Sequence, residues 1–116
     1  MLSNDDIARI ADRIVARQAP LVVGTFGSYA IGTARAGSDL DLFVIKHGPE
    51  RPVARRRAIE RTLFSVLHPL DIHVFTPEEF EETAYEALSF ARVIVRQARI
   101  YHATEEARQR IRSLFP

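Results

Sequence analysis

The sequence predicts an α/β (α+β) fold, with a small mixed sheet of three to four strands and helices packed mainly on one face. Apolar residues recur at helical spacing at both ends of the chain, and short runs rich in β-forming residues lie between those segments. Glycine and proline separate most segments from one another. No repeat and no long Gly/Pro-rich linker divides the chain, so we expect residues 1–116 to form a single domain with one core.

The N-terminal part of the chain predicts a helix followed by a strand. Ser3 and Asp6 resemble a capping box, and apolar residues follow them at helical spacing to about Gln18. Pro20 ends this helix. The apolar run over residues 21–26 then predicts a buried strand, and we expect a tight turn and a short helix after it.

The middle of the chain predicts two further strands joined by a helix. Residues 40–45 form an apolar run closed by a His-Gly-Pro loop, which is typical of a strand. Apolar positions between residues 53 and 67 indicate the helix. Pro69 precedes residues 70–75, which are rich in β-formers and predict the third strand.

The C-terminal part of the chain is predicted to be mostly helical. The segment Thr76-Pro77-Glu78-Glu79 combines an N-cap threonine, a proline at the first helical position and a capping-box glutamate, and so marks a helix start. The helical pattern continues to Val95 and leaves room for a break. Ile100-Tyr101 is expected to add an edge strand, and a last helix should follow Thr104. The apolar contacts of that helix are expected to be Ile111 and Leu114 or Phe115.

Composition and charge exclude several classes of protein. The chain has no cysteine, which excludes disulfides, zinc–thiolate sites and thiol nucleophiles. Its net charge of +1 gives no global field, so we expect neither direct nucleic-acid binding nor attraction to an anionic membrane. No apolar run approaches the roughly 18 residues of a membrane span. We therefore expect a cytoplasmic protein.

Two carboxylates at the start of the second predicted strand indicate a metal site. Side chains alternate along a strand, so Asp39 and Asp41 point the same way while Leu40 points to the opposite face. Adjacent carboxylates repel each other and would take up protons unless a cation lies between them. Hard oxygen ligands suit Mg²⁺ or Mn²⁺, and no cysteine or spaced histidine pair indicates zinc.

Asp71, at the start of the third predicted strand, adds a third carboxylate if the two strands are neighbours. Three acids can hold two metal ions about 4 Å apart, which stabilise the entering and leaving oxygens of an in-line displacement at phosphorus. A strand-edge aspartate can instead cap a turn. His73 shares the alternation of Asp71 and can be either a site residue or a hydrogen-bonded structural histidine.

Gly27 and Ser28, at the end of the first predicted strand, suggest a phosphate site. Glycine lets the backbone turn sharply and approach a ligand closely. Ser28 can begin a helix whose free N–H groups and positive dipole end face an anion, and its hydroxyl can donate to a phosphate oxygen. Neither Gly-x-x-x-x-Gly-Lys nor Gly-x-Gly-x-x-Gly is present, so the two commonest alternative nucleotide motifs are excluded.

Taken in order, these residues resemble the core motif of the DNA polymerase β-like nucleotidyltransferases: Gly27-Ser28-Tyr29-Ala30-Ile31-Gly32, then Ser38-Asp39-Leu40-Asp41-Leu42. The chain is similar in size to the minimal, MntA-type members of this family, which pair with HEPN proteins in toxin–antitoxin modules. The resemblance extends through the Asp71 strand to Arg96-Gln97-Ala98-Arg99-Ile100-Tyr101. It implies the polymerase β-like palm fold and leaves homo- or hetero-oligomers open.

The resemblance also implies an activity: transfer of a nucleoside monophosphate from a nucleoside triphosphate to a hydroxyl, with pyrophosphate leaving. ATP is the implied donor, and two Mg²⁺ or Mn²⁺ ions are the implied cofactors. Asp39 and Asp41 would hold both ions, whereas Asp71 would hold one and help to deprotonate the attacking hydroxyl. Gly27 and Ser28 would bind the triphosphate.

One position departs from the family pattern. The family often carries a basic residue just before the glycine that follows Gly-Ser, and this chain has Ile31 there. Arg35, one helical turn further on, is the candidate replacement for that phosphate contact. The run Arg55-Arg56-Arg57 is most simply a solvated helix face, with binding of an acidic partner or RNA as the alternative.

Three functions follow from these observations. The leading hypothesis is an enzyme that modifies a tyrosine hydroxyl of a HEPN toxin and so acts as its antitoxin. Larger members of the family carry an extra domain that holds the acceptor, and a partner would supply that surface here. The first alternative is a non-catalytic antitoxin that neutralises the toxin by covering it, which the departure at Ile31 favours. The second alternative is transfer to a small molecule such as an aminoglycoside.

Overall fold

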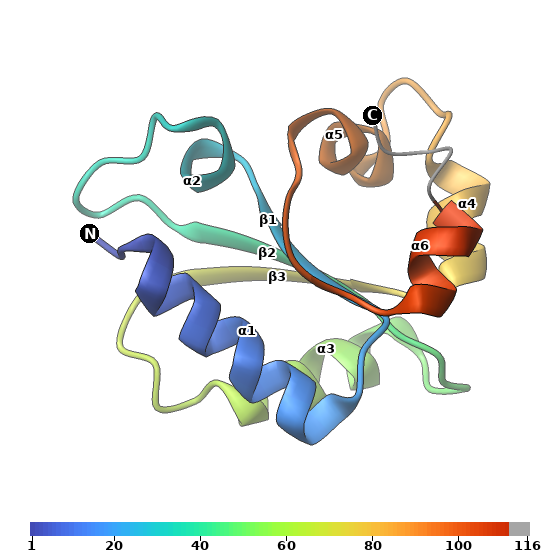
Figure 1. Ribbon diagram of the computed structural model, residues 1–116, viewed down its shortest axis with the longest axis horizontal. Coiled ribbons are helices and arrows are strands. Elements are labelled where there is room, and N and C mark those ends of the chain that lie inside the picture. The colour runs from blue at the N-terminus through green and yellow to red at the C-terminus, as the bar shows by residue number, and fades with distance from the viewer. Residues whose placement is uncertain (112–116) are drawn as a thin grey trace.

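The computed structural model describes residues 1–111, in which a four-stranded sheet is surrounded by six helices (Figure 1). The elements in chain order are α1 (Asn4–Gln18), β1 (Val22–Phe26), α2 (Ser28–Ile31), β2 (Leu40–Ile45), α3 (Pro52–Thr62), β3 (Leu70–Phe75), α4 (Pro77–Thr83), α5 (Phe90–Gln97), β4 (Arg99–Ala103) and α6 (Glu105–Ile111). The predicted α/β class and all four predicted strands are confirmed. The contacts expected of Leu114 or Phe115 lie outside the described residues.

The sheet is mixed and has the order β3-β2-β1-β4. β1 pairs antiparallel with β2 and with β4, and its register with β4 shifts between Val23 and Gly24. β2 and β3 are parallel, and α3 forms the crossover between them. β3 and β4 are therefore the two edge strands. The parallel pair matters most for function, because it decides which residues of β2 and β3 lie side by side.

Helices cover both faces of the sheet. α1 and α3 pack on one face against Leu40 and Leu42, whereas α4, α5 and α6 pack on the other against Phe43 and Ile45 (Figure 1). This distribution is more even than the sequence-based expectation of helices mainly on one face. The reason lies in β2, where every residue except Asp41 is buried, and a strand that is apolar on both sides needs cover on both sides.

Local capping explains where two of the helices begin. Ser3 and Asp6 form the predicted capping box of α1, and Thr76 and Glu79 form a second one at the start of α4. α3 ends at Thr62 and is therefore shorter than the helix predicted between residues 53 and 67. Leu67 lies beyond its end and is almost fully exposed. Within residues 1–111, no helix is both long enough and apolar enough to cross a membrane.

A buried arginine joins α3 to α4. Arg55 is 1% exposed and makes two hydrogen bonds of 2.7 Å to the carboxylate of Glu79. Glu79 also accepts from the Thr76 N–H, so one side chain both caps α4 and anchors it to α3. The hydrogen bonds from Arg55 hold the pKa of Glu79 below its usual value. The predicted solvated face is therefore wrong for Arg55 and confirmed for Arg56 and Arg57, which are exposed.

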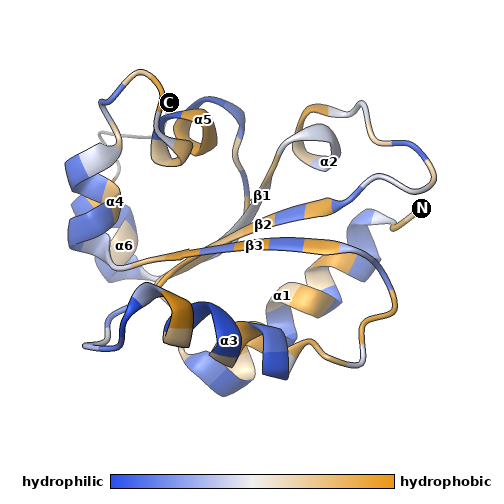
Figure 2. Ribbon diagram, turned by 180° about the vertical axis from the view of Figure 1, so that it is seen from behind, coloured by the Kyte–Doolittle hydropathy of each residue, from blue (hydrophilic) through white to orange (hydrophobic). Residues whose placement is uncertain are grey.

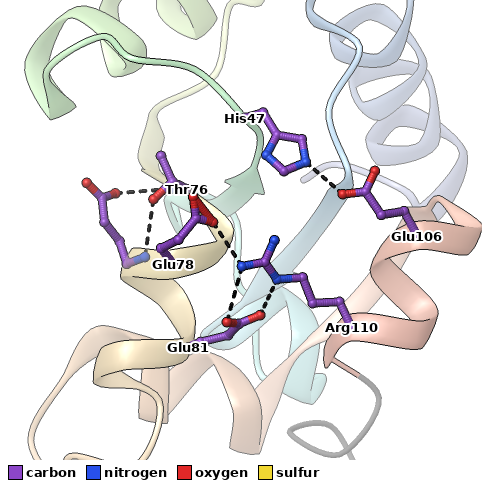
Figure 3. Close-up of polar contacts among 7 residues, drawn as sticks. His47, Thr76, Glu78, Glu81, Glu106 and Arg110 are labelled. Carbon is purple, nitrogen blue, oxygen red and sulfur yellow. Dashed lines mark hydrogen bonds and ion pairs between the residues drawn. The ribbon is translucent and has the colours of Figure 1, made fainter.

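Ion pairs on the surface connect α6 to its neighbours (Figure 3). Arg110 of α6 donates to Glu81 at 2.6 Å and to Glu78 at 3.1 Å, both on α4. His47, in the loop after β2, lies 2.7 Å from Glu106 of α6. Exposed ion pairs typically contribute below about 1 kcal/mol each. The apolar side of α6, which enters the core, therefore accounts for more of its attachment.

Candidate active site

The parallel pairing of β2 and β3 brings two of the predicted acids side by side. Asp41 and Asp71 are register partners, and their side chains point to the same face of the sheet. Neighbouring strands lie about 4.8 Å apart, so the two carboxylates are close. Asp41 is partly buried and Asp71 is exposed. The sequence left open whether the Asp71 strand neighbours the Asp41 strand, and the structure shows that it does.

Asp39 lies outside the β2–β3 pairing that places Asp41 beside Asp71. It lies one residue before β2 and is exposed, and its alternation with Asp41 directs it toward the same face. Its charge acts on Asp41, although less strongly than that of Asp71. In the arrangement seen for residues 1–111, no three His, Asp or Glu side chains lie close enough together to hold a metal ion. The two-ion site is therefore still a prediction.

The crowding of negative charge changes the titration of Asp41. Partial burial raises the pKa of the Asp41 carboxyl above its usual range, and the charges of Asp71 and Asp39 raise it further. His73 acts in the opposite direction without cancelling the effect. A divalent cation would remove the repulsion, because it stabilises neighbouring carboxylates in their charged form. A donor set made only of carboxylate oxygens fits Mg²⁺ or Mn²⁺.

The backbone turn at Gly27, which belongs to the predicted phosphate site, lies directly against Asp41. Gly27 is the N-cap of α2 with φ 70° and ψ −154°, a combination that is essentially limited to glycine. A Cβ atom at this position would collide with the carboxylate of Asp41. Glycine is therefore required here twice, once for the backbone conformation and once for the close approach of the turn to Asp41.

The short helix α2 carries the predicted phosphate donors. Ser28 opens it, and the N–H groups of Ser28 and Tyr29 belong to the first turn, so they have no partner within the helix. α2 is about one turn long, which limits the contribution of its dipole. The N–H of Gly27 already donates to the side-chain oxygen of Gln97 at 2.9 Å. Gln97 is absent from the predicted site residues, although the terminal segment of the family resemblance contains it.

Arg35 lies elsewhere than the prediction placed it. Gly32 has a left-handed conformation with φ 84° and ends α2 after Ile31, so Arg35 lies in the following loop and not one helical turn further on. The Arg35 N–H donates to Ser38 Oγ, and the Ser38 N–H donates to the Arg35 carbonyl, both at 2.9 Å. The side chain of Arg35 is exposed. A phosphate contact from Arg35 is still a prediction.

His68 holds the loop in front of the acids. Its Nε2 donates to the Ser38 carbonyl at 2.9 Å, and its ring lies edge-on to Tyr29 with the centroids 5.9 Å apart. The Tyr29 hydroxyl in turn accepts from the Leu2 N–H at 3.2 Å. These contacts join the start of the chain, α2 and the segment leading to Asp39. The sequence predicted only a surface role for His68, because none of these partners is near it in the chain.

His73 is both a packed residue and a neighbour of the acids. Its Nε2 lies 3.2 Å from Asp71 Oδ2. Its ring packs between Phe26 and Phe90, with centroid distances of 5.3 and 4.5 Å. Phe90 begins α5 and is 58% exposed, so aromatic side chains line the site beside Asp71. The structural role considered for His73 from the sequence is therefore confirmed by its packing, whereas a part in the chemistry of the site is still a prediction.

A comparison with protein-family models matches residues 7–109 to the nucleotidyltransferase domain. The chain belongs to the nucleotidyltransferase domain family. The matched range contains the Gly27 turn, all three predicted acids and the whole sheet. The nucleotidyltransferase assignment made from the sequence is confirmed, and it gives the reaction class of this domain.

Solved structures share this nucleotidyltransferase fold at low sequence identity. A candidate nucleotidyltransferase of Sulfolobus solfataricus has a TM-score of 0.61 at 19% identity, covering 87% of this chain and 80% of its own. A mutant MntA toxin–antitoxin structure has a TM-score of 0.57 at 18% identity, covering 97% and 86%. A toxin–antitoxin structure with AMP-PNP has a TM-score of 0.57 at 20% identity, covering 91% and 85%. None of the curated proteins compared matches the chain in sequence.

Proposed function

We propose that this nucleotidyltransferase domain transfers AMP from ATP to a tyrosine hydroxyl of a HEPN-type partner, and so acts as the antitoxin of a toxin–antitoxin pair. The observation that carries the proposal is the pairing of Asp41 with Asp71 directly against the Gly27 turn. Groups suited to a cation and groups suited to phosphate thereby lie at one end of the sheet. The likeness to an MntA toxin–antitoxin structure and to one with AMP-PNP supports this choice of partner and donor.

Each of the three acids has its own role in the proposed reaction. Asp39 and Asp41 would hold two Mg²⁺ or Mn²⁺ ions, one of them shared with Asp71. When bound, such ions neutralise charge that develops on the phosphate oxygens. Asp71 also accepts the proton of the attacking hydroxyl, whose oxygen bonds to the α-phosphorus as the bond to pyrophosphate breaks. The exposure of Asp71 leaves room for that hydroxyl beside it.

The turn from β1 into α2 orients the triphosphate. The first-turn N–H groups at Ser28 and Tyr29 and the Ser28 hydroxyl donate to phosphate oxygens, and Gly27 allows the phosphates to come close to Asp41. Arg35, in the adjoining loop, supplies a positive charge that Ile31 does not. Because ATP is the proposed donor, the proposed location is the cytoplasm.

The test is transfer of label from ATP to the partner. The chain is incubated with a HEPN-type protein, sought among the products of the neighbouring genes, in the presence of α-labelled ATP and Mg²⁺, and label on that protein is followed with and without EDTA. Asp39→Asn, Asp41→Asn and Asp71→Asn should each abolish labelling. Asp12→Asn, a change of the same type at an exposed position of α1, is the matched control and should label normally. Absence of label with the wild-type chain, or equal label from Asp41→Asn, would overturn the proposal.

A non-catalytic antitoxin is the second candidate, and two observations favour it. The N–H of Gly27, which could bind phosphate, is already bonded to Gln97, and the family's basic position is taken by Ile31, which is exposed. Measuring how well variants of the chain neutralise the toxin distinguishes the two functions. If Asp39→Asn and Asp41→Asn protect cells from the toxin as well as the wild-type chain does, covering of the toxin explains the protection and catalysis does not.

A further inference from the structure

The turn at Gly27 is tied to a helix 70 residues further along the chain. The Gly27 N–H donates to the side-chain oxygen of Gln97, the last residue of α5, at 2.9 Å. Figure 2 shows α2, which follows Gly27, on the same side of the sheet as α5. The hydrogen bond therefore connects the predicted phosphate site to a helix that has no part in the reaction as proposed above.

The position of Gln97 follows from the pairing of β1 with β4. Thr25 pairs with Arg99 in an antiparallel register, so the same register carried two residues further sets Gly27 opposite Gln97. At Gln97, however, the backbone belongs to α5, because β4 begins only at Arg99. The side-chain amide of Gln97 supplies the acceptor that a longer β4 would have offered from its backbone. It continues the pairing beyond the end of β1, as far as the turn.

This hydrogen bond leaves the phosphate donors of α2 free. Backbone groups that join strands lie in the plane of the sheet, whereas side chains such as that of Asp41 stand on its faces. The Gly27 N–H is directed toward the β4 side of the sheet, because its acceptor lies there. The N–H groups of Ser28 and Tyr29 have no partner within α2. Occupation of the Gly27 N–H by Gln97 is therefore compatible with a working phosphate turn.

Gly27 needs support from outside the turn because its backbone conformation is unusual. Its φ of 70° and ψ of −154° lie in a sparsely populated region, and such conformations persist only where the surroundings fix them. The Gly27 carbonyl accepts from the N–H groups of Ala30 and Ile31 at 3.0 and 3.1 Å. Among residues 1–111, Gln97 alone binds the Gly27 N–H. Loss of this acceptor would release one side of the turn and let it move away from Asp41.

α5 also reaches the acid side of the candidate active site. It begins at Phe90, whose ring packs on that of His73 with the centroids 4.5 Å apart, and His73 Nε2 lies 3.2 Å from Asp71 Oδ2. It ends at Gln97, beside the phosphate turn. A helix of eight residues spans about 12 Å, and the buried side of α5 belongs to the core. One anchored helix therefore contacts both halves of the site and helps to fix their separation.

We propose that Gln97 is a positioning residue for the triphosphate: its side-chain amide holds the Gly27 turn so that the first N–H groups of α2 face the phosphates. The inference rests on the proposed function, because it concerns the nucleotide site of that reaction. Gln97 acts through Gly27 and not on the substrate itself. The turn binds the triphosphate before and during transfer, so loss of the Gln97 acceptor should raise the KM for ATP and leave kcat unchanged.

The first test follows the hydrogen bond directly. Gln97→Met keeps the length and helix propensity of the side chain and removes the acceptor, whereas Gln97→Glu keeps an oxygen acceptor. Without nucleotide or metal, amide exchange at Gly27 of the ¹⁵N-labelled chain should be about fivefold faster in Gln97→Met and slow again in Gln97→Glu. Gln109→Met makes the same change at an exposed position of α6 and is the matched control. Equal exchange in the wild-type and Gln97→Met chains, or no recovery in Gln97→Glu, overturns the proposal.

The second test gives the direction of the effect on ATP binding. Calorimetry with ATP and Mg²⁺, without the partner, should show about fivefold weaker binding by Gln97→Met than by the wild-type chain or Gln109→Met. If Gln97 only blocked an N–H that binds phosphate, its replacement would strengthen binding. Tighter or unchanged binding of ATP by Gln97→Met therefore overturns the proposal, as does a wild-type chain that does not bind ATP.

Transfer kinetics with the HEPN-type partner separate a positioning role from a structural one. Gln97→Met should raise the KM for ATP about fivefold and leave kcat and the KM for the partner unchanged. A chain that is only less stable contains fewer active molecules, so a lower kcat with both KM values unchanged overturns the proposal. If Gln97→Met transfers AMP as the wild-type chain does, the positioning role is refuted while the proposed function stands. If the wild-type chain binds ATP but transfers nothing, and Gln97→Met binds it more weakly, the proposed function fails and the positioning role stands.

Discussion

Replacing Gly27 with alanine should destabilise the chain and abolish nucleotide transfer together. A non-glycine residue at φ 70° and ψ −154° costs about 1–3 kcal/mol. The added Cβ also collides with the Asp41 carboxylate, and forcing that side chain aside costs about 1–3 kcal/mol more. The free energy of unfolding should therefore fall by about 2–6 kcal/mol, a large part of the stability of a typical domain. Transfer should be lost because Asp41 no longer lies beside Asp71.

Urea denaturation followed by circular dichroism measures this change, and Gly32→Ala is its control. Gly32 also has a positive φ, 84°, but a Cβ there meets open space, so only a backbone cost of about 1 kcal/mol is expected. Shortening Asp41 should relieve the collision, so Gly27→Ala should cost at least about 1 kcal/mol less in an Asp41→Ala background. Equal costs for Gly27→Ala and Gly32→Ala, or strict additivity with Asp41→Ala, would refute the contact between Gly27 and Asp41.

Three further predictions concern charge. The pKa of Asp41 is raised, so the folded chain binds more protons than the unfolded chain and stability falls as pH rises from about the ordinary value of 3.8 through the folded pKa. Asp41→Asn should therefore raise the urea midpoint at neutral pH and lose this advantage in acid. Mg²⁺ should raise the Tm of the wild-type chain and not that of Asp41→Asn, because only a folded site that binds the ion gains stability from it. Glu79→Gln should cost about 1–3 kcal/mol and more than Arg55→Met, because it leaves a buried charge unpaired, although the partial exposure of Glu79 moderates the loss. The lowered pKa of Glu79 means that this cost is present above its ordinary value of 4.5 and vanishes as pH falls through the folded pKa, which denaturation at several pH values would reveal.

The strands could be predicted closely because local signals define them. Residues 40–45 and 70–75 match β2 and β3 at both ends, since each is a run of strand-forming residues with turn residues next to it. The capping boxes at Ser3 and Thr76 gave the starts of α1 and α4 for the same reason. The acids of the candidate site were also visible, because alternation along a strand is a local property.

Contacts between distant segments could not be predicted in this way. Gln97 bonds to Gly27 and His68 bonds to Ser38 across intervals of the chain that carry no periodic signal. Arg55 is buried because Glu79 of the next helix reaches it, whereas the sequence shows only three arginines in a row. The prediction that Asp71 joins the other acids required β2 and β3 to be neighbours. The sequence could not show this, because parallel pairing depends on how the crossover helix packs.

The features of the site that lower stability are also the ones that the proposed chemistry needs. Asp41 is held beside another negative charge, and Gly27 has a backbone conformation that other residues avoid, whereas the core on both sides of the sheet follows the usual packing rules. Local departures from those rules are expected where function requires them. A chain that only covered its partner would gain stability from Asp41→Asn and lose nothing. If that variant is more stable, still binds the partner and no longer transfers AMP, the acid pair is present for catalysis and not for folding or docking.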